Sequence, residues 1–188
     1  MKDAGKYNAI VTDALKQGTL ASRINAVLEL VKIKITVLVS FTTALGYFLA
    51  AKAPGLEFIY SSAGIFLLAC SSAALNQYQE SGTDVLMKRT SERPIPSGRI
   101  SKQSALIITG LLFGTGSAVL ILKANLPAYI TGLVTFFWYN AVYTPLKKKT
   151  ALAIIPGSLV GALPPVAGWL AAGGSPFDGK IIMVAAYF

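Results

Sequence analysis

The stretch FIYSSAGIFLLACSSAALNQYQESGTD, from Phe58 to Asp84, joins an apolar run to a polar tail. About 20 largely apolar residues are needed for a helix to cross the hydrocarbon core of a bilayer. If the helix continues for a turn or two beyond Gln77, then Asn76, Glu80 and Asp84 recur at every fourth position and share one helical face. The stretch therefore predicts a membrane-spanning helix that carries oxygen-bearing side chains to one membrane surface.

The whole chain has the composition of a multi-pass membrane protein. It is 54% hydrophobic and 13% charged, with a mean hydropathy of +0.60, whereas a soluble domain is about 25% charged. Apolar runs long enough to span the membrane occupy residues 33–51, 58–77, 105–122, 126–143 and 151–172, and another begins near Gly179. The prediction is an all-α, polytopic transmembrane helical bundle at residues 31–188, preceded by an amphipathic cytoplasmic lead-in at residues 1–30.

The basic residues predict how the bundle is oriented. Of the 17 Lys and Arg residues, 14 fall on one side of these spans. By the positive-inside rule, the N-terminus and the loops after the second and fourth spans face the cytoplasm, and we expect a multi-pass protein of the bacterial inner membrane. The cations flank spans and no stacking aromatic residues are interleaved with them, so we expect no nucleic-acid partner.

The chain has no histidine and one cysteine, Cys70, which lies inside an apolar run. A disulfide framework is therefore excluded within this sequence, and so is chemistry that depends on histidine. Cys70 is most simply a small packing residue. Any reaction must use carboxylates, tyrosines, cations or a metal held by oxygen.

The carboxylates of the opening stretch suit such a metal. Asn76, Glu80 and Asp84 offer hard oxygen ligands, which Mg²⁺ accepts when substrate phosphates complete its coordination shell. The following residues supply donors for phosphate oxygens, namely Lys88, Arg89 and Arg93. Together they predict a metal-diphosphate site, and the alternative is that these charges only solvate a helix end.

Local helix breakers bear on this prediction. Gly82 weakens a continuous helix through Asp84, so we expect an irregular last turn. In the fifth span, PGSLVGALPPVAGW contains small residues that permit close helix packing, and its Pro164 and Pro165 are expected to bend or break the helix.

A second candidate constellation is WYNAVYTPLKKKT, at the end of the fourth span. Tyr143 and Lys147 are four residues apart, although Pro145 is expected to interrupt the helix between them. Lys147 could contact a phosphate, and Tyr143 could place an aromatic face near a developing cation. An interfacial aromatic belt that includes Trp138 and Tyr139, followed by topological lysines, is the alternative explanation.

Several of these motifs, in order along the chain, resemble the UbiA-type intramembrane prenyltransferase superfamily. Asn76, Glu80 and Asp84 resemble its Asn-x3-Asp-x3-Asp signature, with Glu80 in place of the middle Asp. YTPLKKKT is similar to its Tyr-x3-Lys loop, and PGSLVGALPPVAGW to its fifth helix. LMKRTSERP is similar to a segment typical of the haem subgroup, the protoheme IX farnesyltransferases or haem O synthases.

The resemblance implies Mg²⁺-dependent transfer of the farnesyl group of farnesyl diphosphate to a vinyl group of haem b. The product would be haem O, a step in haem A and cytochrome oxidase biogenesis. The implied metal ligands are Asn76, Glu80 and Asp84, which also act in catalysis with Tyr143 and Lys147. The implied diphosphate ligands are Lys88, Arg89, Arg93 and Lys147. The implied partners are farnesyl diphosphate, haem b, the lipid bilayer and haem A synthase.

One part of the family pattern lies beyond this sequence. The family has a second Asp-rich loop after its sixth helix, and the 188 residues end before it. We therefore expect the N-terminal part of a roughly nine-helix enzyme, inactive by itself. Two alternatives stay open: a UbiA-type enzyme with an aromatic, quinone-precursor or chlorophyll-type acceptor, and a non-catalytic membrane scaffold or transporter subunit.

Overall fold

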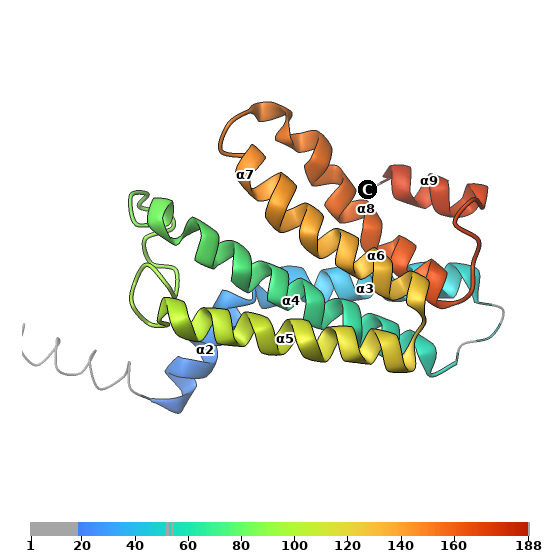
Figure 1. Cartoon of the computed structure of the whole chain (residues 1–188), viewed down its shortest axis with the longest axis horizontal. Helices are drawn as coiled ribbons and strands as arrows, with labels where there is room; N and C mark the ends of the chain where they lie inside the picture. Colours follow the sequence, from blue (N-terminus) through green and yellow to red (C-terminus); the bar gives the residue numbers. More distant parts are fainter. Residues whose placement is uncertain (1–18, 52, 54, 188) are drawn as a thin grey trace, which may run out of the picture.

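A computed structural model describes residues 19–51, 53 and 55–187, and within them it is helical with no strand (Figure 1). The predicted all-α class is therefore confirmed. The first described helix, α2 (Leu20–Leu30), falls in the predicted lead-in, whose residues 1–18 lie outside the described part of the chain. Thr19 begins α2 by accepting a hydrogen bond from the Ser22 amide.

The long helices follow the predicted spans. They are α3 (Ile33–Ala50), α4 (Glu57–Asp84), α5 (Lys102–Lys123) and α8 (Ile154–Ala171), which continues a 3₁₀ turn (Ala151–Ala153). Within the described residues, these four are long and apolar enough to cross a membrane. The remaining predicted span, residues 126–143, corresponds to three consecutive helical segments: α6 (Leu126–Phe137), a π-helix (Trp138–Tyr143) and α7 (Thr144–Leu146). The helix predicted to begin near Gly179 is α9 (Gly179–Tyr187).

Helix α4 occupies the middle of the bundle. It packs most extensively against α5 and α3, and it also contacts α6 and α8 (Figure 1). Its small residues allow this: a Cβ atom added to Gly116 of α5 would lie 3.1 Å from the Gly64 carbonyl oxygen of α4. The outer surfaces instead expose large apolar side chains, among them Phe41, Leu111 and Phe137. A membrane protein presents such surfaces to lipid, since a water-soluble monomer seldom exposes so many.

Helices α3 and α8 approach each other closely through glycines. A Cβ atom added to Gly168 would lie 1.8 Å from the Thr43 carbonyl oxygen, and one added to Gly46 would lie 1.9 Å from that of Pro165. The predicted close packing of the fifth span is thus confirmed. Of the predicted bend or break, the break is wrong, because α8 continues through Pro164 and Pro165 to Ala171, and the bend stays a prediction. Neighbouring helices support a proline-containing helix in a bundle.

Candidate active site

The last two turns of α4 carry the predicted oxygen ligands on one buried face. Asn76, Glu80 and Asp84 are 0%, 8% and 2% exposed. The predicted irregularity at Gly82 is wrong, since α4 continues to Asp84. Two carboxylates buried on one helical face must be neutralised or hydrogen-bonded, because an unpaired buried charge is strongly unfavourable.

Arg93 neutralises the Asp84 carboxylate. The loop after α4 folds back on the helix end: the Thr90 hydroxyl donates to the Asp84 carbonyl oxygen at 3.0 Å, and Pro94 is fully buried. This fold returns the guanidinium to the carboxylates, with Arg93 Nη1 lying 2.7 Å from Asp84 Oδ2 and 3.6 Å from Glu80 Oε2. The RTSERP segment thus has a structural role in presenting Arg93.

Lys147 neutralises Glu80 from the opposite side. Its Nζ atom lies 2.9 Å from Glu80 Oε1. The predicted disturbance near Pro145 is present: a π-helix precedes Pro145, and the short helix that contains it, α7, ends at Leu146, one residue before Lys147. π-Helical turns occur frequently at functional sites. Tyr143 lies beside Lys147, whose Nζ is 5.3 Å from the centre of the Tyr143 ring.

Thr144 fixes the orientation of the Asn76 amide. The Thr144 hydroxyl donates to the Tyr139 carbonyl oxygen at 2.8 Å, so its oxygen is left to accept a hydrogen bond. Asn76 Nδ2 donates to that oxygen at 3.0 Å. The amide oxygen, Oδ1, must therefore point away from Thr144, toward the other end of the site. Sequence reasoning missed Thr144, which carried no signal beyond its place in the YTPLKKKT segment.

Lys32 is the second residue that sequence reasoning missed. Its Nζ atom donates to Asn76 Oδ1 at 2.9 Å. Burial, together with nearby Arg93 and Lys147, lowers the pKa of Lys32 to about 8, so the ammonium form still predominates at neutral pH. The sequence did contain a signal: Lys32 and Lys34 lie two positions apart and cannot share a helical face, but the spacing does not say which one faces inward.

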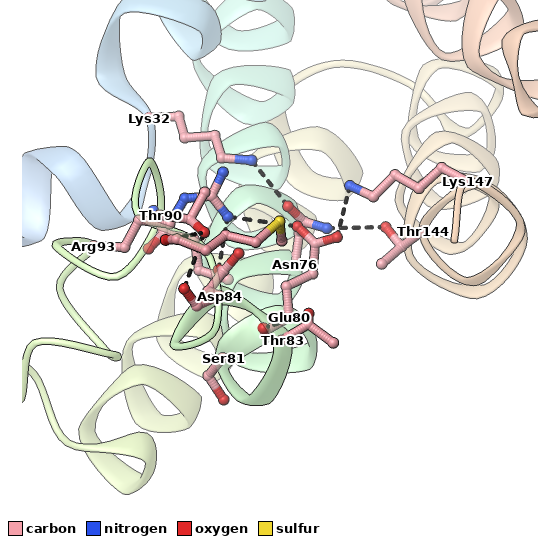
Figure 2. Close-up of polar contacts among 12 residues, drawn as sticks. Lys32, Asn76, Glu80, Ser81, Thr83, Asp84, Thr90, Arg93, Thr144 and Lys147 are labelled. Carbon is pink, nitrogen blue, oxygen red and sulfur yellow. Dashed lines mark hydrogen bonds and ion pairs between the residues drawn. The ribbon is translucent and has the colours of Figure 1, made fainter. Parts of the chain in front are cut away.

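Six residues form what we call the polar cluster: Lys32, Asn76, Glu80, Asp84, Arg93 and Lys147. Figure 2 shows its three cations converging on α4 from different segments of the chain. Lys32 precedes α3, Arg93 lies in the loop after α4, and Lys147 follows α7. Residues far apart in sequence therefore form one site at one end of the bundle.

An apolar cavity of about 140 Å³ adjoins the polar cluster. Its lining comes from α3 and the preceding Lys32, from α4, α6 and α8, and from the π-helix after α6, and it includes Leu68, Gly132 and Tyr139. Lys32 belongs to both the cavity and the cluster, so the charged groups border the apolar space. The tyrosine on this lining is Tyr139, against which Tyr143 stacks at 5.5 Å between ring centres.

The donor set of the polar cluster fits Mg²⁺ in its chemistry. The described residues contain no group of three or more His, Cys, Asp or Glu side chains suited to a metal, so two carboxylates and the oriented oxygen of Asn76 are the candidate ligands. Such a set suits Mg²⁺ when substrate phosphates supply further oxygens. In this structure the same oxygens accept from Lys32, Arg93 and Lys147.

Two of the predicted diphosphate ligands lie away from these contacts. Lys88 and Arg89 are exposed, and neither forms an ion pair with the two carboxylates in the described part of the chain. Arg93 and Lys147 are in place beside them. A role for Lys88 and Arg89 stays a prediction from the sequence.

Comparison with known proteins gives consistent matches. The model of the UbiA prenyltransferase family matches residues 39–188. A protoheme IX farnesyltransferase of Geobacter sulfurreducens is 46% identical over 126 residues, covering 67% of this chain and 46% of the relative. The mitochondrial protoheme IX farnesyltransferase of Arabidopsis thaliana is 39% identical over 166 residues, covering 85% and 38%. The chain thus spans about half the length of the curated relatives that it matches.

Two solved structures share the fold. A digeranylgeranylglyceryl phosphate synthase superposes with a TM-score of 0.77 at 17% identity, covering 87% of this chain and 57% of the other. A UbiA homologue from Archaeoglobus fulgidus bound to GPP and Mg²⁺ superposes with a TM-score of 0.70 at 17% identity, covering 86% and 60%. At this identity the likeness establishes the fold alone.

Proposed function

The chain belongs to the UbiA prenyltransferase family, and we propose that it serves in the transfer of a farnesyl group from farnesyl diphosphate to haem b. One observation carries the proposal: the polar cluster borders an apolar cavity, and Lys32 belongs to both. A prenyl diphosphate has the same division into a highly charged anionic head and an apolar tail. The cluster suits the head, and the cavity suits the tail.

The cations of the polar cluster would bind the departing diphosphate. Arg93 offers a planar set of donors and Lys147 a compact charge, and both already lie within hydrogen-bond distance of carboxylates. When held by Asn76, Glu80 and Asp84, Mg²⁺ supplies Lewis-acid neutralisation of the leaving group. Tyr139 and the aliphatic side chains of the cavity exclude water, so that the allylic cation meets the acceptor rather than solvent.

The reaction on haem b would balance as follows. The C–O bond of farnesyl diphosphate breaks and its electron pair leaves with the diphosphate. The terminal vinyl carbon of haem b bonds to the farnesyl carbon, and water captures the resulting cation with release of a proton. The haem acceptor is proposed because the curated relatives at 36–46% identity are named protoheme IX farnesyltransferases.

The setting of the reaction is part of the proposal. The chain is a multi-pass integral membrane protein. We propose that it lies in the inner membrane of a bacterial cell and that the polar cluster faces the cytoplasm, because most Lys and Arg residues lie on that side of the spans. Haem A synthase, which would consume haem O, stays a predicted partner.

A competition between acceptors tests the proposal. The protein, at the length its gene encodes, is incubated with Mg²⁺, labelled farnesyl diphosphate and either haem b or 4-hydroxybenzoate, and the products are identified by mass. We expect a farnesylated, hydrated haem. If 4-hydroxybenzoate is farnesylated and haem b is not, the protein would instead be a UbiA-type enzyme with an aromatic acceptor. Failure to consume farnesyl diphosphate with either acceptor would support a scaffold or transporter.

A further inference from the structure

The polar cluster holds one positive charge more than its carboxylates require. Arg93 pairs with Asp84 and Lys147 pairs with Glu80, at 2.7 and 2.9 Å. Lys32 is the third cation, and the side chain that accepts its hydrogen bond, Asn76, is neutral. A half-buried ammonium that neutralises no carboxylate leaves a net positive site, which attracts an anion.

The backbone at Lys32 has an unusual left-handed conformation. Lys32 has φ 52° and ψ 52°, and it is the one non-glycine residue with positive φ in the described part of the chain. This left-handed conformation is uncommon for a lysine. The chain just before it is anchored by the neighbour of Asn76 on α4: Gln77 Nε2 donates to the Glu29 and Leu30 carbonyl oxygens, at the end of α2, at 2.9 and 3.1 Å. Backbone outliers that the surroundings hold in place concentrate at functional sites.

Lys32 also competes for the atom that a metal would need. Thr144 orients the Asn76 amide so that Oδ1 faces Lys32 Nζ. An ammonium 2.9 Å from that oxygen repels a divalent cation approaching the same atom. As long as Lys32 stays on Asn76, the third ligand of the candidate metal site is obstructed.

We propose that Lys32 is a diphosphate-binding residue that keeps Asn76 from the metal until the prenyl diphosphate arrives. The diphosphate draws Lys32 Nζ from Asn76 Oδ1 to a phosphate oxygen, and Oδ1 becomes free to bind Mg²⁺. Metal and diphosphate then enter the site as a pair, each raising the affinity for the other. This inference rests on the proposed function, whose metal-diphosphate site it deepens, and it does not depend on the acceptor.

Binding of Mn²⁺, followed by its electron paramagnetic resonance signal, tests the proposal in protein reconstituted into lipid nanodiscs. Each variant is titrated with Mn²⁺ alone and with Mn²⁺ plus an unreactive farnesyl diphosphate analogue. In this analogue, sulfur replaces the oxygen that joins the farnesyl carbon to phosphorus. In the wild type, the analogue should strengthen Mn²⁺ binding about tenfold or more, the range of ordinary coupling between sites. Lys32→Met should bind Mn²⁺ alone about tenfold more tightly than the wild type, with most of the enhancement by the analogue lost.

Two further variants control for charge and position. Lys32→Arg keeps the charge, so it should bind Mn²⁺ alone as weakly as the wild type. Lys34→Met removes an exposed cation two residues away and should behave like the wild type throughout. The inference is overturned if Lys32→Met binds Mn²⁺ alone no more tightly than the wild type. If the wild type binds no Mn²⁺ even with the analogue, the proposed function fails as well.

A measurement on the wild type covers the case in which Lys32→Met does not fold. The protein is labelled with ¹⁵N at lysine Nζ and studied by solid-state NMR, and the Lys32 signal is assigned by its loss in Lys32→Arg. Dipolar coupling to the ³¹P nuclei of the bound analogue should dephase this signal if Lys32 Nζ contacts a phosphate. A Lys32 signal unaffected by ³¹P would mean that the ammonium stays on Asn76, and the proposal would be wrong.

Discussion

Arg93 Nη1 lies 2.7 Å from Asp84 Oδ2, although the two residues are nine positions apart and only one of them belongs to a helix. The pair closes the loop after α4 onto the helix end. Because the Asp84 side chain is only 3% exposed, whereas that of Arg93 is 22% exposed, the carboxylate depends on the guanidinium rather than on solvent for compensation of its charge.

Arg93→Ala should therefore destabilise the protein. We expect the free energy of unfolding to fall by about 3 kcal/mol, because a buried carboxylate loses its partner. Denaturant titration in detergent micelles measures this. Arg89→Ala, which removes an exposed charge in the same loop, should change the free energy by less than about 0.5 kcal/mol. Equal effects of the two substitutions would contradict the importance of the Arg93–Asp84 pair.

Thr144→Val should weaken binding of the metal-diphosphate pair. Without the hydroxyl, Asn76 Nδ2 loses its acceptor and the amide oxygen is no longer directed at the site. An unsatisfied buried donor costs about 1–3 kcal/mol, so affinity for Mn²⁺ with the farnesyl diphosphate analogue should fall about tenfold. Thr144→Ser keeps the hydroxyl and should retain wild-type affinity. An affinity in Thr144→Val equal to that of Thr144→Ser would show that this hydrogen bond does not orient Asn76.

Gly168→Ala should separate α3 from α8. The added methyl group would lie 1.8 Å from the Thr43 carbonyl oxygen, and backbone atoms cannot move aside cheaply. Overpacking of this kind destabilises by about 1–3 kcal/mol. Gly110→Ala in α5 is the matched control, since nothing lies within 4 Å of the added Cβ atom. Thermal unfolding followed by circular dichroism compares the two, and a control as unstable as Gly168→Ala would contradict the close helix contact.

Gly132→Leu should shorten the apolar cavity. A Cβ atom there would lie 2.8 Å from Leu68 Cδ1 and 3.0 Å from Ile65 Cδ1, so a larger side chain must take up cavity space. We expect affinity for the farnesyl analogue to fall about tenfold, as burial of its last carbons is lost. A dimethylallyl analogue should bind almost unchanged. If both analogues lost affinity equally, the cavity would not hold the prenyl chain.

Most of the fold could be predicted from the sequence because membrane-spanning helices depend on run length and hydropathy, which are local properties. The alignment of Asn76, Glu80 and Asp84 was equally local, since helical periodicity fixes it once α4 extends to Asp84. The errors concerned helix breakers. Gly82 was expected to disturb the last turn of α4, which continues through it because helix packing compensates for the weak helix propensity of glycine.

The rest of the site could not be predicted because it depends on contacts between distant segments. Lys32 meets Asn76 across 44 residues, and Thr144 meets it across 68. Nothing in the run LVKIKITV shows that Lys32 turns inward in a left-handed conformation while Lys34 stays exposed. Helical periodicity orders residues within one element but does not specify what another element brings to them.

Asp84→Asn is the most direct test of the proposal that the carboxylates of α4 hold the metal for farnesyl transfer. The measurement is the rate of farnesyl transfer to haem b by the protein at its encoded length, with saturating substrates and Mg²⁺. We expect this rate to fall about 100-fold or more in Asp84→Asn, whereas Glu92→Gln, which changes an exposed carboxylate in the adjoining loop, should retain the wild-type rate. Transfer by Asp84→Asn at the wild-type rate would show that these carboxylates do not hold the catalytic metal.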